Sequence, residues 1–577
     1  MQSKGRKRSR KIYKKQGPFS TFGIMLIVFL VLFIISSIVF LYMRYSFTKD
    51  RANLTEYYKG VDENEVSIYI NDVLMKDGDG NISNKALYEN DAVYLPLSWV
   101  KSKLNNRFYY AKDIERIRYC LADEIITRGV NDMHQVGNAA YVLMKDEPYL
   151  LMEFVSDYTN IRFEKYTKDT HKRLFIYDIW EKENFAFMSA NESARWRGGN
   201  KSPIIEDLNK GEQVKVLDKM VKWSKVKTLN GYVGYVRNTR LQNEISKIPE
   251  STYVEPKREW HGLSEKVVLG FHQVTMNYPA NRLPELLKDT AGMNVIAPTL
   301  YAFKNDDGEL RSVANLEYVK ACHNRGLKVW PTINNFDILD VNEKLIFSNT
   351  FTRKNIIDRI IKEVELCEYD GINLDMESLS KDVGEDYVQF VRELSVELNK
   401  RKITLSIDAF IPYEFNNHYD MQEIGEFADY VVVMCYDEHY SGSKTAGSVS
   451  SLPYVIEGID LSLDNVERSK LVVGLPFYTR IWTTDKDGKV SSRAYASKLA
   501  EQYSNSYGIK FEYDDATGQN YGSVINEDGA KIECWLEDEL SLTMKMDQVK
   551  YNNLAGTAAW KLSFERENFF DIINMNK

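Results

Sequence analysis

At 577 residues the chain is too long for a single hydrophobic core, so three or four domains are expected. Its 44% hydrophobic and 27% charged residues are typical of globular protein. The five cysteines are scattered, odd in number and without a CxxC pair, and the seven histidines form no ligand-like cluster. This pattern argues against a disulfide framework and a zinc site, and no metal or cofactor is expected.

The first residues combine a basic segment with a long apolar run. Residues 1–21 carry eight Lys and Arg and no acidic residue, and residues 22–43 contain no charge. As a helix this run would be about 33 Å long, enough to cross a bilayer core of about 30 Å. Basic residues mark the cytoplasmic side of such a span, which predicts a single-pass cell-membrane protein with a cytoplasmic tail and an extracellular remainder. A cleaved signal peptide is the alternative.

Beyond this segment the chain is acidic. Residues 1–45 hold nine of the 75 Lys and Arg and none of the 83 Asp and Glu, so the rest carries a net charge of −17. An acidic surface repels the phosphate backbone, and no nucleic-acid partner is expected.

Residues 65–180 are predicted to form a β-rich domain with an internal repeat. The runs 93–100 and 148–155 are similar, and each leads into an Arg-Phe pair, at 107–108 and at 162–163. A strand, a helix and a strand in each copy indicate two related units packed together. The pattern resembles the N-terminal domain of copper amine oxidases, from which no metal chemistry follows.

Residues 185–245 show the pattern of short strands broken by turns. An Asn-Gly pair at 230–231 lies between two alternating runs, which predicts a hairpin. The segment resembles a bacterial SH3 domain. The resemblance implies either a binding site for a cell-wall peptide or a purely structural barrel.

From residue 266 onward, apolar strand-like runs alternate with helical stretches. This alternation predicts an α/β fold, a (β/α)8 TIM barrel over residues 265–577, although a doubly wound sheet would give a similar pattern. The predicted architecture is thus a barrel preceded by two β-rich domains and one transmembrane helix. The candidate strands are 267–271, 294–297, 328–332, 371–377, 403–407, 430–436, 471–475 and 557–560.

The strand at 371–377 carries polar side chains on one face. Because side chains alternate along a strand, Asn373, Asp375 and Glu377 share the face opposite the apolar residues. Burying two carboxyls on the inward face of a barrel strand is costly unless they are paired or used. Glu377 ends the strand, where barrel active sites are built. A half-exposed edge strand is the alternative.

Residues 370–377 read DGINLDME and resemble the signature D-G-x-D-x-D-x-E of glycoside hydrolase family 18, with Asn373 in place of one Asp. Residues 434–437, 474–478 and 559–560 resemble the sixth, seventh and eighth strands of that family. Within it, the chain is most similar to the bacterial cell-wall and spore-cortex N-acetylglucosaminidases, a similarity carried by residues 294–299 and 534–538. The resemblance also implies a small α+β insertion at about residues 483–550.

The resemblance implies substrate-assisted, retaining catalysis, in which Glu377 protonates the leaving oxygen and the 2-acetamido oxygen of the sugar attacks. Asp375 would orient the acetamido N–H and help to keep Glu377 protonated. Tyr436 would hydrogen bond to the acetamido oxygen, and Trp560 would form the floor under the sugar. Both aromatic residues could instead belong to the barrel core.

Further substrate-binding residues are expected around these groups. Asp370 and Asn373 are expected to support Asp375 through hydrogen bonds. The predicted substrate is a glycan containing N-acetylglucosamine, cleaved at β-1,4 bonds. Peptidoglycan is favoured, and a chitinase, a catalytically silent lectin-like protein and a surface scaffold are the alternatives. The complete set of substrate-binding candidates is Asp370, Asn373, Met434, Asp437, Tyr478, Arg480 and Trp560.

Overall fold

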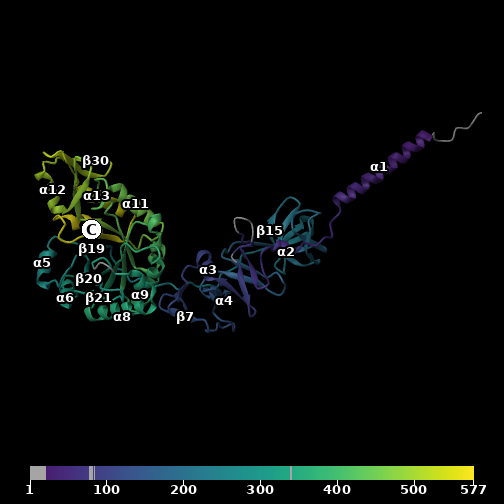
Figure 1. The fold of residues 1–577 in the computed structure, drawn as a ribbon, viewed down its shortest axis with the longest axis horizontal. Coiled ribbons are helices and arrows are strands. Elements are labelled where there is room, and N and C mark those ends of the chain that lie inside the picture. The colour runs from purple at the N-terminus through teal and green to yellow at the C-terminus, as the bar shows by residue number, and fades with distance from the viewer. Residues whose placement is uncertain (1–20, 77–81, 84, 338–340, 577) are drawn as a thin grey trace, which may run out of the picture. The chain divides into compact units, whose positions relative to one another are not determined.

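The structure is a computed structural model that describes residues 21–76, 82–83, 85–337 and 341–576 (Figure 1). The basic tail predicted for residues 1–21 therefore lies outside the described residues, except for its last residue. The predicted apolar span is the helix α1 (Thr21–Tyr45). The segment Phe22–Tyr45 has a mean hydropathy of 3.3 and is not buried, so it is long and apolar enough to cross a membrane. A signal sequence near the N-terminus would have the same length and composition.

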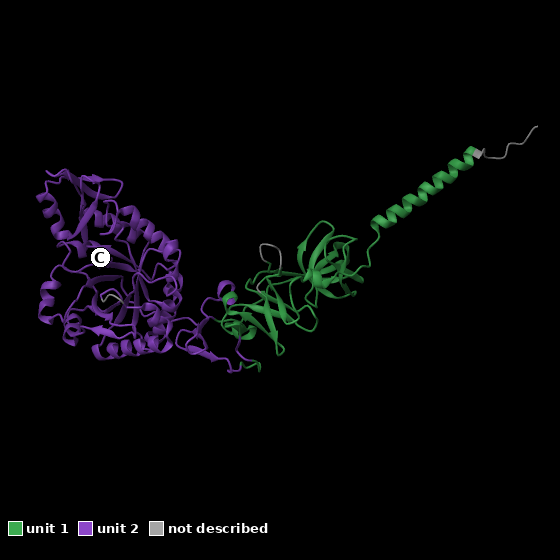
Figure 2. Cartoon of the chain, in the orientation of Figure 1, with its two compact units in different colours: residues 1–99, 134–138, 144–254 green, residues 100–133, 139–143, 255–577 purple. Residues whose placement is uncertain are grey.

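The chain divides into two compact units (Figure 2). The hydrophobic cluster around Phe175 and the cluster around Val226 lie wholly in the first unit. The clusters around Leu269 and Leu374 lie wholly in the second. The first unit consists of residues 1–99, 134–138 and 144–254, and the second of residues 100–133, 139–143 and 255–577.

The first unit begins with a sheet whose strands pair in the order β10-β11-β1-β3-β4-β9. Strands β4 and β9 pair antiparallel, and each leads directly into a helix, α3 (Leu97–Lys103) and α4 (Met152–Asp157). The strand–helix repeat expected from the sequence is thus present in both copies. The resemblance to copper amine oxidases stays a prediction. The strands are β1 (Glu65–Ile70), β3 (Ala86–Glu89), β4 (Ala92–Pro96), β9 (Glu147–Leu151), β10 (Arg162–Tyr166) and β11 (Arg173–Tyr177).

The second sheet of this unit has seven strands in the order β14-β13-β17-β16-β15-β12-β18. The predicted hairpin joins β16 to β17, where Gly231 adopts a φ of +74° that suits glycine. The strands are β12 (Glu183–Met188), β13 (Glu192–Arg195), β14 (Ile204–Leu208), β15 (Gln213–Lys219), β16 (Trp223–Lys227), β17 (Val233–Arg237) and β18 (Leu241–Lys247).

The second unit contains a closed parallel barrel, which confirms the predicted fold. Strand β19 pairs with both β20 and β33, so the sheet has no gap between its first and last strands. The third barrel strand is split into two short pieces. The barrel strands are β19 (Val267–His272), β20 (Val295–Phe303), β22 (Lys328–Val329) with β23 (Thr332–Asn334), β24 (Gly371–Asp375), β25 (Thr404–Ala409), β26 (Tyr430–Met434), β27 (Leu471–Pro476) and β33 (Gly556–Trp560).

Alternation along the strands divides the apolar side chains between two cores. Val267, Leu269 and Phe271 of β19 join a cluster inside the barrel, whereas Val268 joins the larger cluster beneath the helices. The helices lie around the barrel (Figure 1). They include α6 (Leu316–His323), α8 (Thr350–Cys367), α9 (Gly384–Asn399), α10 (Met421–Phe427), α11 (Leu452–Leu463), α13 (Glu539–Tyr551) and α14 (Phe569–Ile573).

The predicted α+β insertion follows β27. Its five-stranded antiparallel sheet has the order β29-β28-β32-β31-β30 and carries helix α12 (Ser497–Ser506). The strands are β28 (Tyr478–Thr484), β29 (Val490–Ala496), β30 (Phe511–Asp514), β31 (Gln519–Ile525) and β32 (Lys531–Trp535).

A small sheet from the range predicted for the first β-rich domain belongs instead to the unit of the barrel. Its strands are β5 (Tyr109–Ala111), β6 (Arg116–Cys120) and β7 (Ile125–Gly129), and β6 packs on α9. The Arg118 guanidinium lies 2.9 Å from the Glu393 carboxylate, and Tyr109 donates to Asp386 at 2.6 Å.

Candidate active site

Strand β24 places its side chains as the alternation predicts. Ile372, Leu374 and Met376 belong to the core beneath the helices, whereas Asn373 and Asp375 point into the barrel. Asn373 is fully buried and Asp375 is 4% exposed. Two polar side chains are therefore held out of water on the inside of the barrel.

The carboxyl of Glu377 follows the strand and is partly exposed. Burial raises the pKa of this carboxyl, and the negative charge of Asp437 raises it further. A raised pKa keeps the proton on the acid towards neutral pH, which suits a proton donor. The predicted contribution of Asp375 stays a prediction, and the charge of Glu377 in turn raises the pKa of Asp375.

The side chain of Asn335 forms two hydrogen bonds with the backbone of Glu377, and the sequence analysis did not identify Asn335 as a site residue. Asn335 Oδ1 accepts a hydrogen bond from Glu377 N at 2.9 Å, and Asn335 Nδ2 donates to Glu377 O at 2.8 Å. Asn335 follows directly after β23, the strand that pairs with β24. The consecutive residues Asn334 and Asn335 at the carboxyl end of this strand were the available signal.

Asp375 interacts with a second carboxyl that the sequence did not single out. Burial, followed by the charges of Asp408 and Glu377, raises the pKa of Asp375 well above its usual range. Asp408 lies on β25, is 6% exposed and also has a strongly raised pKa, chiefly through burial. Asn373 Nδ2 donates to Asp408 Oδ2 at 2.7 Å. The predicted support of Asp375 by Asn373 is therefore replaced by support of Asp408.

The aromatic residues after β26 and β27 lie close to these carboxyls. Tyr436 and Tyr478 contact edge to face, with ring centroids 6.5 Å apart. Tyr478 donates to Asp437 at 2.6 Å. Burial, and then the charges of Asp375 and Asp408, raises the pKa of Tyr436, so its hydroxyl stays protonated and able to donate. Met434, at the end of β26, is 8% exposed.

Trp560 lies at the carboxyl end of a barrel strand, and Arg480 lies in the insertion that follows β27. Trp560 ends β33, is partly exposed and packs against Phe271 with ring centroids 5.4 Å apart. Arg480 lies on β28 of the insertion and donates to Ser492 at 3.1 Å. Trp560 also packs against the cluster inside the barrel, so its role as the floor of a sugar site stays a prediction.

Asp370 lies apart from this group. It precedes β24, whereas Asp375 ends it, and five residues of strand span about 17 Å. Its carboxylate binds Lys328 Nζ at 2.8 Å, His323 Nε2 at 2.8 Å and the backbone N–H of Val329 at 2.9 Å. The structure therefore corrects its predicted role: Asp370 ties the amino ends of neighbouring strands together.

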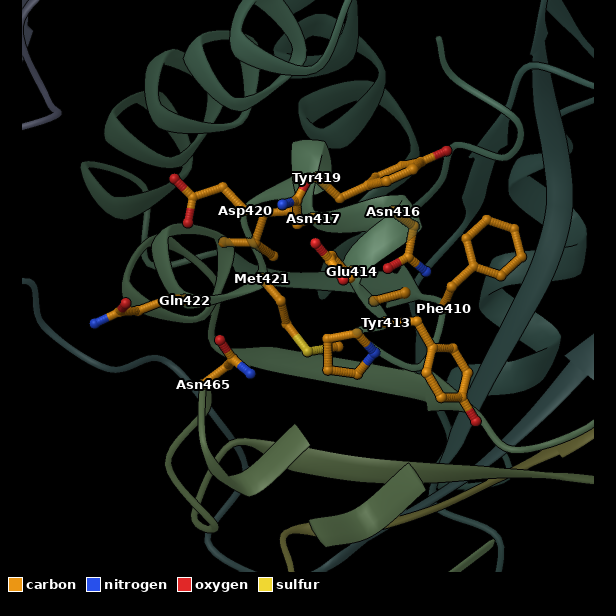
Figure 3. Close-up of a pocket in the computed structure, with 13 residues that line it drawn as sticks. Phe410, Tyr413, Glu414, Asn416, Asn417, Tyr419, Asp420, Met421, Gln422 and Asn465 are labelled. Carbon is orange, nitrogen blue, oxygen red and sulfur yellow. The ribbon is translucent and has the colours of Figure 1, made fainter. Parts of the chain in front are cut away.

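A cavity of about 200 Å³ follows the carboxyl end of β25 (Figure 3). Its lining includes Tyr419, whose hydroxyl accepts a hydrogen bond from Leu379 N at 2.9 Å, in the loop after Glu377. Aromatic and polar side chains alternate around it, including Phe410, Tyr413, Glu414, Asn416, Asn417, Asp420, Met421, Gln422 and Asn465.

Neither a candidate metal centre nor a disulfide is found among the described residues. Within the described parts of the chain, no group of three or more His, Cys, Asp or Glu is placed to hold a metal ion. All five cysteines are buried free thiols, and burial raises the pKa of Cys435 to about 12.

Two carboxyls with raised pKa values, those of Asp375 and Glu377, lie where barrel active sites are built, and acid catalysis by a carboxyl is the chemistry of glycoside hydrolases. The model of Glycosyl hydrolases family 18 matches residues 231–565, more than half of the chain, so the chain belongs to glycoside hydrolase family 18. The model of the bacterial SH3 domain matches residues 198–242, which confirms that prediction.

Similar proteins include further glycosidases. The uncharacterized glycosylase YvbX of Bacillus subtilis (strain 168) is 27% identical over 292 residues, covering 49% of this chain and 84% of that protein. The cortical fragment-lytic enzyme of the same organism is 24% identical over 259 residues, covering 43% of this chain and 60% of that protein. The crystal structure of the Bacillus cereus spore cortex-lytic enzyme SleL has a TM-score of 0.49 at 20% identity, covering 57% of this chain and 79% of that one.

Proposed function

We propose that this glycosidase cleaves β-1,4 bonds after N-acetylglucosamine in peptidoglycan, with the substrate supplying the nucleophile. The position of Asp375 and Glu377 at the carboxyl end of β24, in a chain of this family, carries this proposal, and the raised pKa of Asp375 supports it. A carboxyl must be ionised to attack the anomeric carbon, and burial beside Asp408 and Glu377 disfavours that charge. The 2-acetamido oxygen of the sugar needs no ionisation and can attack in its place.

Each predicted catalytic residue then has a defined part in the reaction. Glu377 gives its proton to the leaving glycosidic oxygen while the acetamido oxygen forms a bond to the anomeric carbon, which produces an oxazolinium ion. Asp375 accepts the acetamido N–H, and Tyr436 donates to the acetamido oxygen. Glu377, now a carboxylate, takes a proton from the water that opens the ring, so two displacements retain the configuration.

The other candidates shape the place of the sugar. The partly exposed ring of Trp560 would support the apolar face of the sugar at the cleavage point, as aromatic rings do. The hydrogen bond from Tyr478 to Asp437 presents a polar pair to the sugar hydroxyls. Met434 and Arg480 would complete the walls of the site.

The surroundings of the barrel favour a cell-wall substrate. We propose that α1 spans the cell membrane with its N-terminus in the cytoplasm, so that the barrel lies outside the cell. The SH3-like domain would hold a wall peptide near the glycan. A relative named for the lysis of cortical fragments supports the same substrate class. Chitin also carries the required acetamido group and is the second candidate.

The test compares the full chain in detergent with its Glu377→Gln variant on purified peptidoglycan and on chitin oligosaccharides. Mass spectrometry of the new reducing ends identifies the bond that is cut. Reducing N-acetylglucosamine ends released from peptidoglycan by the wild type alone support the proposal. Preferential cleavage of chitin would make the protein a chitinase, and binding without cleavage of either glycan would make it lectin-like.

A further inference from the structure

The chain after α1 is attached directly to the second sheet of the first unit. Asn200 Nδ2 donates to Tyr45 O, on the last residue of α1, at 3.0 Å. Further along, Ala52 N donates to Ile204 O at 2.7 Å, and Ile204 N donates to Asp50 O at 2.8 Å. Ile204 begins β14, the edge strand of this sheet, so the segment after α1 pairs with an edge that would otherwise be open. The end of α1 is therefore held at one place on the sheet.

Phe47 strengthens this attachment. Two guanidinium groups lie over its ring, that of Arg237 at 4.5 Å and that of Arg195 at 5.3 Å from the ring centroid. Arg195 is 3% exposed, and its Nη1 donates to Thr48 O at 3.2 Å. Contacts between a cation and an aromatic ring are stronger when the cation is kept from water. Phe47 and Thr48 therefore order the first residues after α1.

These contacts set the level of the sheet relative to the bilayer that α1 is proposed to span. The apolar run 22–43 is about 33 Å long as a helix and fills a bilayer core of about 30 Å, so Tyr45 lies about 3 Å beyond it, among the lipid head groups. Asn200 binds the backbone of Tyr45, and Lys201 Nζ donates to Ser46 Oγ at 3.0 Å. The loop that carries Asn200 and Lys201 is therefore at the level of the head groups.

A hairpin tip with exposed apolar side chains lies beside this loop. A Cβ atom added to Gly198 of the loop would meet Met220 Cε at 3.5 Å and Trp223 Cβ at 3.2 Å. Met220 and Val221 connect β15 to β16 and are 41% and 94% exposed. Two neighbouring apolar side chains that are exposed at this level are suited to enter the head-group layer of a membrane.

Three exposed cations lie on the same loop and tip. Within the described parts of the chain none of the three forms an ion pair with a carboxylate. Lys219 of the same hairpin is paired with Glu244 at 2.6 Å, and the neighbouring Asp218 lines a cavity together with Lys225. The chain beyond α1 is acidic as a whole, so a basic group here is a local exception, and it is complementary to the phosphates of anionic lipids. The cations are Arg197, Lys201 and Lys222.

We propose that a juxtamembrane face of the SH3-like domain docks on the outer surface of the membrane that α1 spans. Its cations bind the phosphate groups of anionic lipids, and its two apolar side chains enter the head-group layer. The inference rests on the proposed membrane span of α1 and is independent of the reaction in the barrel. The face consists of Arg197, Lys201, Met220, Val221 and Lys222.

The test places a fluorophore on this face in the full chain, reconstituted in lipid vesicles. All five native cysteines are buried, so Val221→Cys provides an exposed thiol for labelling. The matched control is Leu229→Cys, because Leu229 is 60% exposed in the turn at the other end of β16, about 17 Å from the tip. The vesicles contain phosphatidylcholine alone, or equal parts of phosphatidylcholine and phosphatidylglycerol. Nitroxide groups on the lipid heads quench a fluorophore that comes close to them.

We expect the probe at Val221→Cys to be quenched in both membranes, more strongly in the anionic one, and the probe at Leu229→Cys to be quenched far less. Arg197→Gln, Lys201→Gln and Lys222→Gln together should lower the ratio of docked to undocked molecules by about 100-fold in the anionic membrane. In the neutral membrane this triple variant should match the wild type, which controls for its fold. Added salt tests the same cations without substitutions and should lower the quenching in the anionic membrane only.

Equal quenching of the two probes would overturn the proposal. Quenching at Val221→Cys that is the same in the anionic membrane with and without the three cations, or with and without salt, would also overturn it. The measurement needs no glycan, so a failure to cleave peptidoglycan leaves it unaffected. Flotation of the vesicles tests the span separately: a chain that does not float with them overturns the span and the docking together. A chain that floats while the probe at Val221→Cys stays unquenched overturns the docking alone.

Discussion

Asn335 makes the contact on which the position of the catalytic acid depends most directly. Its amide accepts from Glu377 N at 2.9 Å and donates to Glu377 O at 2.8 Å, and the side chain is 8% exposed. The Asn335→Ala variant loses both hydrogen bonds and a third, which Asn335 Nδ2 donates to Glu343 Oε1 at 3.0 Å. Since each contributes about 1 kcal/mol net, the free energy of unfolding should fall by about 3 kcal/mol.

The rate should fall by more than this loss of stability suggests. Without Asn335 the backbone of Glu377 can shift, and a displacement of about 1 Å at a reacting group costs roughly 100-fold in rate. We expect kcat to fall by about this factor and KM to change little, because the acid acts mainly in the transition state. The assay measures new reducing ends over time, with urea unfolding of the same samples.

Asn294 provides the matched control. Its side-chain amide also binds the backbone, accepting from Val268 N at 2.8 Å and donating to Lys266 O at 2.8 Å. These contacts lie at the amino ends of the strands, away from the site. Asn294→Ala should lose stability while keeping the kcat of the wild type. If Asn335→Ala also kept kcat within about twofold of the wild type, proton delivery would not depend on the hydrogen bonds of Asn335, and this prediction would be refuted.

Three further outcomes follow from the contacts of the site and its unit. Glu377→Gln should lower kcat by roughly 10²–10⁴-fold with folding retained, measured by reducing-end release and circular dichroism. Because Glu377 must be protonated to act as the acid, kcat should fall as pH rises through its pKa. Asp437 raises that pKa, so Asp437→Asn should move the fall of kcat to lower pH in a pH–rate profile. Glu393→Gln leaves Arg353, 0% exposed, and Arg118 without their carboxylate, and should cost about 3–5 kcal/mol in urea unfolding.

The barrel could be predicted because its signals are local. Each strand is a short apolar run, and the inward residues of β24 follow from alternation by two along a single segment. Asn373 and Asp375 therefore occupy the inward positions expected from the sequence, whereas Glu377 lies two residues beyond the end of the strand that was expected to contain it. Asp370 belongs to the same motif but precedes β24, at the end of the strand away from the site. The motif alone does not tell which of its residues reach the site.

The partners of these residues could not be predicted in the same way. Asn335 directly follows β23 and Asp408 lies on β25, the two strands that pair with β24, and each looks ordinary within its own segment. Asp408 continues the inward alternation of Thr404 and Ser406, and it is the last polar residue before the strand ends. Reading that alternation on every barrel strand would have identified it, because neighbouring strands place equivalent positions at one level.

The sheet of β5, β6 and β7 shows the same limit over a longer distance in the chain. Glu393 of α9 receives Arg353 from α8 at 3.1 Å and Arg118 from β6 at 2.9 Å, and it is 2% exposed. A lone buried carboxylate of this kind would be costly, so the three side chains must be brought together by one folded unit. Residues 100–133 therefore complete the outer surface of the barrel, although they precede it by more than one hundred residues. The domain boundary at residue 180 that the sequence predicts separates Arg118 from Glu393, the carboxylate with which it pairs.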